Sequence, residues 1–201
     1  MMRKQWFLWV CMFVVCCLTT PAGVFAAEQQ PAVDQDKIIA DNTAIITTHP
    51  YNVVAHYQRG KAYFAKKEFD LALQDYNRAI AITMLNRGYL YEKQGLDDKA
   101  IEQYTLAIAN DPTYEEAYDH RGFMYNKTGR PNLALIDCGK ALEINPKFTP
   151  GYLNKGTAYE KLHLTREAIE TYSGLLANAP LEDVKHREVA KRRILALGGT
   201  I

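Results

Sequence analysis

Along most of the chain, apolar and polar residues are spaced as in amphipathic helices that come in pairs joined by tight turns. One clear pair covers residues 85–93 and 98–109, with Gly95 in the turn between them. Asp97 is expected to cap the second helix, because its carboxylate can accept the free backbone N–H groups at the helix start. Pro112 ends the pair, since proline cannot continue a helix. The pattern predicts an all-α chain.

These helix pairs repeat in register. A glycine, a tyrosine three positions later and an alanine nine positions after that recur four times, at offsets of 28, 34 and 34 residues. The recurring residues are Gly60, Gly88, Gly122 and Gly156, then Tyr63, Tyr91, Tyr125 and Tyr159, then Ala72, Ala100, Ala134 and Ala168. Further along each unit stands an aromatic residue, Tyr76, Tyr104 or Tyr172, with Cys138 in the third unit. A period in this range predicts stacked repeats, with small residues where two helices cross.

This signature resembles the tetratricopeptide repeat over residues 53–180. The resemblance implies a right-handed α-solenoid of antiparallel helix pairs, whose first helices line a concave groove that binds a protein or peptide partner. The expected organisation is a signal peptide at 1–26, a flexible lead-in at 27–33, a degenerate half-repeat helix at 34–50, a truncated first repeat at 53–82, three further repeats at 83–114, 115–148 and 149–181, and a C-terminal capping helix at 182–197. In that last helix, Ala190, Ile194 and Leu197 should form one apolar stripe.

The junction between the first two repeats is shortened. Its offset of 28 residues lacks six residues of the usual period, including the loop proline. Residues 79–85 therefore run straight from one helix towards the next. The sequence predicts either a very tight turn or a fusion of the two helices near Ile82.

The first residues predict an export signal. Arg3 and Lys4 precede a run of thirteen mainly apolar residues, 6–18, and small residues follow at Ala26 and Ala27. Such a run is short for a membrane span and is typical of a secretory signal peptide, cleaved here after Ala26. We expect an exported protein, periplasmic or secreted. The alternative is an uncleaved anchor, and only then is a membrane expected as a partner.

The charge and cysteine content exclude other classes. Without residues 1–26 the chain keeps 22 of its 24 basic residues and all 23 acidic ones, and no basic stripe stands out. Nucleic acid is therefore not an expected partner, because its binding depends on clustered Lys and Arg. Cys138 is then the one remaining cysteine, so no internal disulfide is expected.

No pattern in the chain favours catalysis. The histidines lack ligand spacing with a cysteine or with one another: His49, His56, His120, His163 and His186. Cys138 occupies a core position of a second helix, where a small buried residue is expected. An enzyme would need a pocket of scattered carboxylates such as Glu92, Asp119 and Glu160, and their spacing does not support one. We expect no enzyme activity, no cofactor, no metal and no small-molecule substrate.

The resemblance places the candidate partner-binding residues on the first helices of the repeats. They are Tyr57, Lys61, Phe64, Leu85, Asn86, Tyr89, Glu92, Asp119, His120, Phe123, Asn126, Leu153, Asn154, Thr157 and Glu160. The aromatic members offer a large contact area at low entropic cost, which suits recognition of a peptide or helix. The alternative for Tyr89 and Phe123 is that their rings pack between neighbouring first helices.

Chaperone-binding members of this family hold a C-terminal carboxylate with a lysine, two asparagines and a lysine–arginine pair. The corresponding residues of the first three repeats here are Tyr57, Lys61, Asn86, Glu116 and His120. Only Asn86 matches, and Glu116 would repel a carboxylate, so this function is not expected. The predicted function is an exported non-catalytic adaptor or scaffold, of the kind used in envelope assembly or secretion. Self-association of the repeats is the structural alternative.

Overall fold

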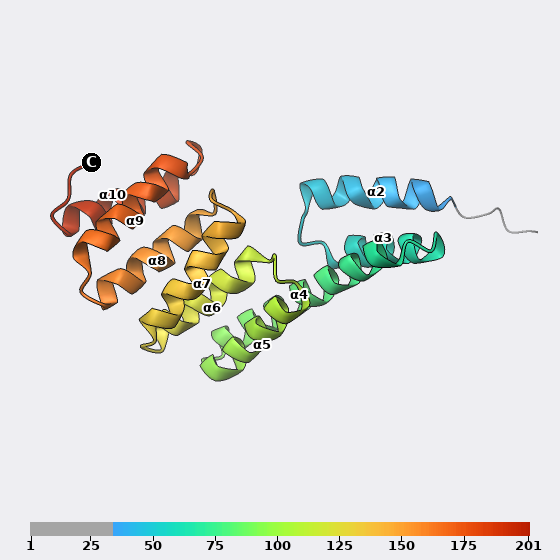
Figure 1. Cartoon of the computed structure of the whole chain (residues 1–201), viewed down its shortest axis with the longest axis horizontal. Helices are drawn as coiled ribbons and strands as arrows, with labels where there is room; N and C mark the ends of the chain where they lie inside the picture. Colours follow the sequence, from blue (N-terminus) through green and yellow to red (C-terminus); the bar gives the residue numbers. More distant parts are fainter. Residues whose placement is uncertain (1–33) are drawn as a thin grey trace, which may run out of the picture. The chain divides into compact units, whose positions relative to one another are not determined.

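The computed structural model describes residues 34–201 (Figure 1). This part of the chain is helical and contains no strand. In order, its helices are α2 (Gln35–Thr48), α3 (Val53–Ala65), α4 (Phe69–Lys93), α5 (Asp97–Asn110), α6 (Glu115–Lys127), α7 (Pro131–Ile144), α8 (Thr149–Lys161), α9 (Thr165–Asn178) and α10 (Val184–Ala196). The predicted signal peptide and lead-in fall outside the described residues.

The helices pack mainly against their neighbours in sequence. α3 packs on α4, α4 on α5, α6 on α7, and α8 on α9, while α6 and α8 also touch directly (Figure 1). α2 covers α3 at one end, and α10 packs on α9 and α8 at the other. Contacts of this local kind define a solenoid, so the predicted all-α solenoid of helix pairs is confirmed for this part of the chain.

Small residues allow the two helices of each pair to cross closely. A Cβ added at Gly88 would lie 2.5 Å from the ring of Tyr104, which is fully buried between α4 and α5. Ala100, on the facing helix, is also fully buried. The recurrent glycine and alanine are therefore steric requirements of the crossing, as the repeat signature predicts.

Of the two alternatives predicted for the shortened junction, a very tight turn or a helix fusion, the structure has the fusion. α4 is one continuous helix of 25 residues, which joins the second helix of the first pair to the first helix of the second pair. Ala81 and Ile82, at the middle of α4, are fully buried and pack in one cluster with Tyr114 and Ala117. The six missing residues thus leave no loop at this junction.

At two of the helix crossings, an arginine on the first helix forms hydrogen bonds with a buried aspartate on the second. Arg59 donates two hydrogen bonds to Asp75 at 2.8 Å, from α3 to α4. Arg121 does the same with Asp137, at 2.7 and 2.8 Å, from α6 to α7. Burial alone would raise the pKa of Asp75, but the hydrogen bonds from Arg59 and His56 hold it below its usual value.

Two details of the helix ends differ from or extend the sequence prediction. The expected capping role of Asp97 is wrong: α5 already begins at Asp97, its N-cap is Leu96, and no side chain caps it. The Asp97 carboxylate instead accepts a hydrogen bond from Lys127 Nζ at 2.6 Å.

In the turns between paired helices, Gly95 and His163 both adopt positive φ angles, of 73° and 60°. His163 therefore holds a conformation that favours glycine.

The C-terminal helix closes the stack as expected. Ala190 and Ile194 of α10 are buried against Tyr172 and Leu175 of α9, and Leu197 packs on the same cluster. The predicted apolar stripe is thus confirmed. Within residues 34–201, no helix combines the length and apolar character that crossing a bilayer requires.

Candidate partner-binding groove

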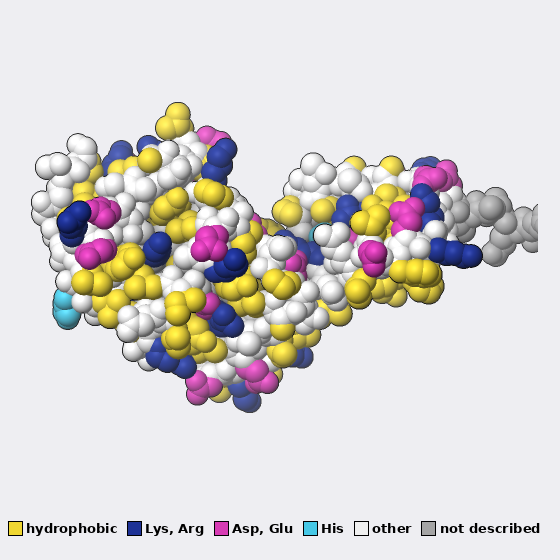
Figure 2. Space-filling model, viewed as in Figure 1, with side chains coloured by type: hydrophobic (Ala, Val, Ile, Leu, Met, Phe, Trp, Pro, Cys, Tyr) yellow, Lys and Arg dark blue, Asp and Glu magenta, His cyan; other side chains and the backbone are white. Residues whose placement is uncertain are grey.

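Four aromatic side chains are exposed on the first helices of the first three pairs. We call Tyr57 and Phe64 of α3, Tyr89 of α4 and Phe123 of α6 the aromatic face. Tyr57 is 50% exposed, Tyr89 43% and Phe123 40%. In Figure 2, hydrophobic side chains are visible over the region of α3 and the start of α4, where Phe64 meets Phe69 with 5.6 Å between ring centroids. Large apolar area left in water at these positions is free to bind another molecule.

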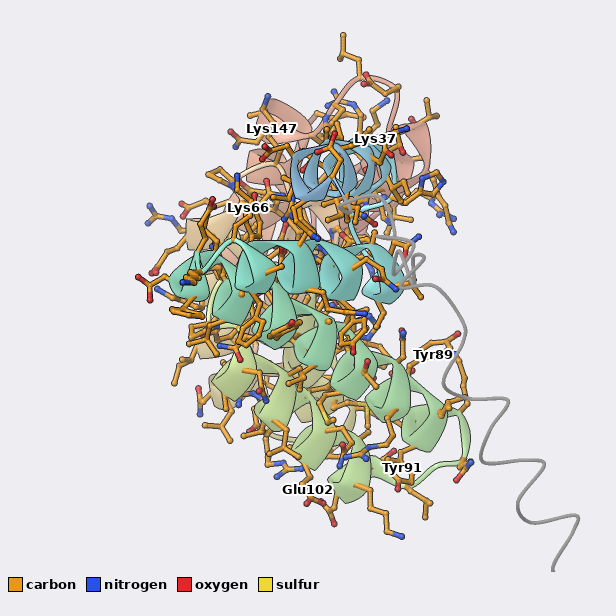
Figure 3. The ribbon with its side chains drawn as sticks, turned by 90° about the vertical axis from the view of Figure 1, so that its right-hand side faces the viewer. Lys37, Lys66, Tyr89, Tyr91, Glu102 and Lys147 are labelled. Carbon is orange, nitrogen blue, oxygen red and sulfur yellow. The ribbon has the colours of Figure 1, made fainter. Side chains whose placement is uncertain are left out.

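The surroundings of Tyr89 combine features of both alternatives, packing between first helices and exposure to a partner. Its ring lies edge-on to His120 of α6, with 6.4 Å between centroids, and Lys93 Nζ lies 4.6 Å from its centroid. Tyr89 therefore contacts the neighbouring first helix and still exposes much of its surface. Figure 3 shows Tyr89 at one edge of the α4–α5 pair and Glu102 of α5 at a different edge.

Two of the predicted groove residues are buried instead of exposed. Asp119 is 6% exposed and Asn126 is 3% exposed, and both lie where α6 packs against α8. Asn154 of α8 joins them: its Nδ2 donates to Asp119 Oδ1 at 2.8 Å, and its backbone oxygen accepts from Asn126 Nδ2 at 2.8 Å. Burial raises the pKa of the Asp119 carboxyl to about 7. Expecting Asp119 and Asn126 on the open face was wrong, because α6 and α8 approach closely there.

The two predicted groove glutamates have a role within the repeat. Glu92 Oε2 accepts a hydrogen bond at 3.1 Å from the hydroxyl of buried Tyr104, and Glu160 Oε1 accepts one at 2.5 Å from Tyr172. His120 lies close to Glu92, with 3.9 Å between Nδ1 and Oε2, and burial lowers the pKa of its imidazole. These carboxylates tie the second helix of a pair to its first helix.

The remaining candidates divide between core and surface. Leu85 and Leu153 pack against buried clusters, and Thr157 donates a hydrogen bond to the Leu153 backbone oxygen at 2.8 Å. Asn86 and Lys61 are exposed, with Lys61 Nζ 5.8 Å from the Tyr57 centroid. The exposed part of the predicted set is therefore mainly aromatic.

One apolar hollow was missed by the sequence prediction. It lies between α3 and α4 and has a volume of about 610 Å³. Its lining is Val53, Tyr57, Tyr76, Ala79, Ile80, Thr83 and Met84. The lining residues on α4 lie within or before residues 79–85, where the two helices are fused. The shortened repeat offset was therefore the available sequence signal for this hollow.

Residues 34–201 contain no cluster of three or more His, Cys, Asp or Glu arranged to hold a metal ion.

Comparison with known proteins identifies the repeats. Family models described as tetratricopeptide repeat match residues 53–83, 81–114 and 115–148. No curated protein sequence matches the chain. The overlap of the first two matches, at residues 81–83, falls within the fused helix α4.

Solved structures of the same repeat are similar to this chain. The first TPR domain of Spaghetti (RPAP3), bound to the HSP90 peptide SRMEEVD, is 27% identical with a TM-score of 0.53, and the match covers 60% of this chain and 97% of that one. The TPR domain of Arabidopsis OM64 is 28% identical with a TM-score of 0.53, over 59% and 96% of the two chains. The first TPR domain of human RPAP3 is 27% identical with the same TM-score, over 59% and 93%. With their recurrent Gly, Tyr and Ala positions and their stacked helix pairs, residues 53–148 of this chain are tetratricopeptide repeats.

Proposed function

We propose that this protein is a non-catalytic adaptor that binds a segment of a protein partner on the face formed by its first helices. The observation that carries the proposal is the aromatic face, whose rings stand exposed on the first helices of successive pairs. Rigid aromatic side chains provide much of the binding energy at protein interfaces. TPR domains similar to this one have been solved with a bound peptide, which supports the same class of ligand.

The partner differs in chemistry from the HSP90 peptide of the similar RPAP3 domain. Where the chaperone-binding family members place basic residues to hold a carboxylate, this chain has Tyr57, Glu116 and His120. Burial raises the pKa of Glu116, and once ionised this side chain repels a carboxylate. The exposed aromatic rings instead favour an apolar segment, such as an extended strand or one side of a helix.

Site-specific photo-crosslinking in the native cell tests this proposal. A photoreactive residue at Tyr89 probes the aromatic face, and the matched control is the same residue at exposed Glu102 on α5 (Figure 3). A discrete adduct from Tyr89 alone, containing a second protein, is the expected result. Equal labelling from both positions would show that the aromatic face is not the binding surface.

We also propose that the protein acts after export, in envelope assembly or secretion. The support is the basic, apolar and small-residue succession of residues 1–26. N-terminal sequencing of the protein isolated from its cell should give a chain that starts at Ala27. A chain that retains residues 1–26 in the membrane fraction would favour the anchored alternative.

Self-association is a second candidate, which the apolar hollow between α3 and α4 favours. The hollow leaves Tyr57 and Ile80 about half exposed at its border. Sedimentation velocity over a range of concentrations separates the two functions. A single monomeric species with an intact crosslink from Tyr89 would leave partner binding as the function, and a concentration-dependent dimer lost in Ile80→Asp would support self-association.

A further inference from the structure

The fused helix α4 leaves uncovered a surface that the other helix pairs bury. The second helix of each later pair is covered by the helix that follows it, α5 by α6, α7 by α8 and α9 by α10. In the first pair, the second helix is residues 69–82 of α4, and the chain continues straight into residues 83–93, the first helix of the second pair. Because the chain does not turn back there, no following helix covers residues 69–82, and the apolar hollow lies beside them.

Two apolar residues of the first pair are exposed where the later pairs cover theirs. Leu73 is 58% exposed and Ile80 is 41% exposed. Their counterparts are partly buried in all three later pairs: Ile101, Leu135 and Ile169 for Leu73, and Ile108, Leu142 and Leu176 for Ile80. The surface that faces the next pair elsewhere in the chain is therefore open in the first pair.

The second pair has the matching open surface. Leu90 is 59% exposed, whereas its counterparts in the other pairs are at most 1% exposed: Ala62, Met124 and Ala158. Thr83 is exposed as well, and its counterparts are buried: Ala55, Ala117 and Gly151. These positions face the preceding pair elsewhere in the chain. One molecule thus has both halves of a stacking contact, and both halves are open.

Contacts between the later pairs show which positions meet. Ile101 of α5 packs in one cluster with Met124 of α6, and the residues at the corresponding positions of α4 are Leu73 and Leu90. A Cβ added at Gly151 of α8 would lie 3.2 Å from Leu142 of α7. The residues at those positions of α4 are Ile80 and Thr83.

These residues of α4 cannot meet within one molecule. Leu73 and Leu90 are roughly 26 Å apart along α4, because a helix rises about 1.5 Å per residue. Their spacing suits a second α4 that runs antiparallel to the first. The stripe is Leu73, Tyr76, Ile80, Thr83, Arg87 and Leu90, at alternating steps of three and four residues on one side of the helix.

The stripe is symmetric about its centre, between Ile80 and Thr83. Across an antiparallel pair of α4 helices, Leu73 faces Leu90 and Ile80 faces Thr83 of the other copy, at both ends alike. Tyr76 then faces Arg87, and a guanidinium is attracted to an aromatic ring. These are the same partners that the contacts between the later pairs indicate.

We propose that two copies of this chain associate through antiparallel α4 helices, so that the first pair of each copy stacks on the second pair of the other. Each copy then supplies the covering helix that the other lacks, and two-fold symmetry makes the two contacts identical. The inference rests on self-association, the second candidate under the proposed function, and specifies its geometry. Tyr89 and Phe123 are not part of the stripe, so a dimer of this kind leaves them for a partner.

A charge pair tests which residues face each other. In sedimentation velocity of the full chain, Leu73→Glu and Leu90→Lys should each raise the dimer Kd at least about tenfold, because each buries an unpaired charge. The double variant places a carboxylate opposite an ammonium at both contacts and should recover most of the affinity. Ile136→Glu, at a residue of α7 that is 68% exposed, is the control and should leave the Kd unchanged. A double variant no tighter than either single variant would overturn the arrangement.

Restoring the missing loop is a second test. A copy of the six residues 110–115, inserted between Ala81 and Ile82, gives the first junction the length of the second. The second pair can then fold back on the first pair of its own chain, so we expect a folded monomer. A dimer that keeps the wild-type Kd would contradict the proposal.

The outcomes separate this inference from the proposed function. A wild-type chain that stays monomeric, with a partner adduct at Tyr89, would overturn the inference and leave partner binding standing. A dimer that Ile80→Asp abolishes but the charge pair does not restore would support self-association and overturn the antiparallel arrangement. A dimer restored by the charge pair, without a partner adduct at Tyr89, would support the inference and refute partner binding on the aromatic face.

Discussion

Replacing Asp119 by asparagine is expected to stabilise the folded protein above neutral pH. The Asp119 carboxyl is buried between α6 and α8 with one hydrogen-bond donor and no ion-pair partner among the described residues. Asparagine keeps an oxygen that can accept the bond from Asn154 Nδ2 and carries no charge. The substitution therefore removes the cost of a buried ion and keeps the packing almost unchanged.

The magnitude follows from the shift in the pKa of Asp119. It rises from 3.8 to about 7 on folding, mainly because burial disfavours the charged form. Between these values the folded state binds more protons than the unfolded state, so the stability that Asp119 contributes is complete below pH 3.8 and is lost as the pH rises through about 7. Roughly three pKa steps of 1.36 kcal/mol each amount to about 4 kcal/mol at pH 8. This is a large part of the total stability of a domain, about 5–15 kcal/mol.

Urea unfolding at pH 5 and pH 8 measures the effect. The free energy of unfolding of Asp119→Asn should exceed that of the wild type by up to about 4 kcal/mol at pH 8 and by much less at pH 5. Other titrating groups contribute to both proteins and cancel in the difference, and exposed Glu102→Gln serves as the control. If Asp119→Asn is less stable than the wild type at pH 8, Asp119 is not a buried uncompensated carboxyl and the reasoning fails.

Three further changes test the fold by urea unfolding or thermal melts. Gly88→Ala should lower the free energy of unfolding by about 1–3 kcal/mol, because the added Cβ would lie 2.5 Å from a buried tyrosine ring. In the control Gly139→Ala the added Cβ meets nothing within 4 Å, and this variant should be more stable by about 0.5–1 kcal/mol. Equal effects of the two variants would contradict the close helix crossing at Gly88. Thr83→Pro should lower the free energy of unfolding by about 3 kcal/mol or more, because proline interrupts the continuous helix α4. The control Thr83→Ala should lower it by less than about 1 kcal/mol. A neutral Thr83→Pro would mean that a loop lies there. His163→Gly should stabilise by about 1 kcal/mol by relieving a φ of 60°, and a loss of stability would refute that strain.

The repeat pattern predicted the fold because steric requirements recur in register. Gly88 must be small since a tyrosine ring lies against it, and that requirement is readable at each recurrence. The shortened offset likewise narrowed the junction to a very tight turn or a fused helix, because six missing residues leave no length for the usual loop, and the structure has the fused helix. Sequence position failed where the outcome depends on how closely two helices approach. It assigned Asp119 and Asn126 to the open face, and the contact of α6 with α8 buries both.

Helix ends were predicted less well for a local reason. Asp97 is a suitable capping residue by type, but α5 starts one position earlier than expected, so its carboxylate binds Lys127 instead. Candidate site residues show the same limit. The exposed rings of Tyr57 and Tyr89 could be placed from the repeat, whereas the hydrogen bond from Tyr104 to Glu92 depends on how closely the two helices pack.

The binding affinity of the crosslinked partner for the double variant Tyr89→Ala with Phe123→Ala tests the central claim most directly. The affinity should fall at least about tenfold, as expected when exposed aromatic anchors are truncated, while the melting temperature stays close to that of the wild type. An unchanged affinity would show that the aromatic face does not bind the partner. A large fall in melting temperature would assign both rings to the packing between first helices and contradict the account.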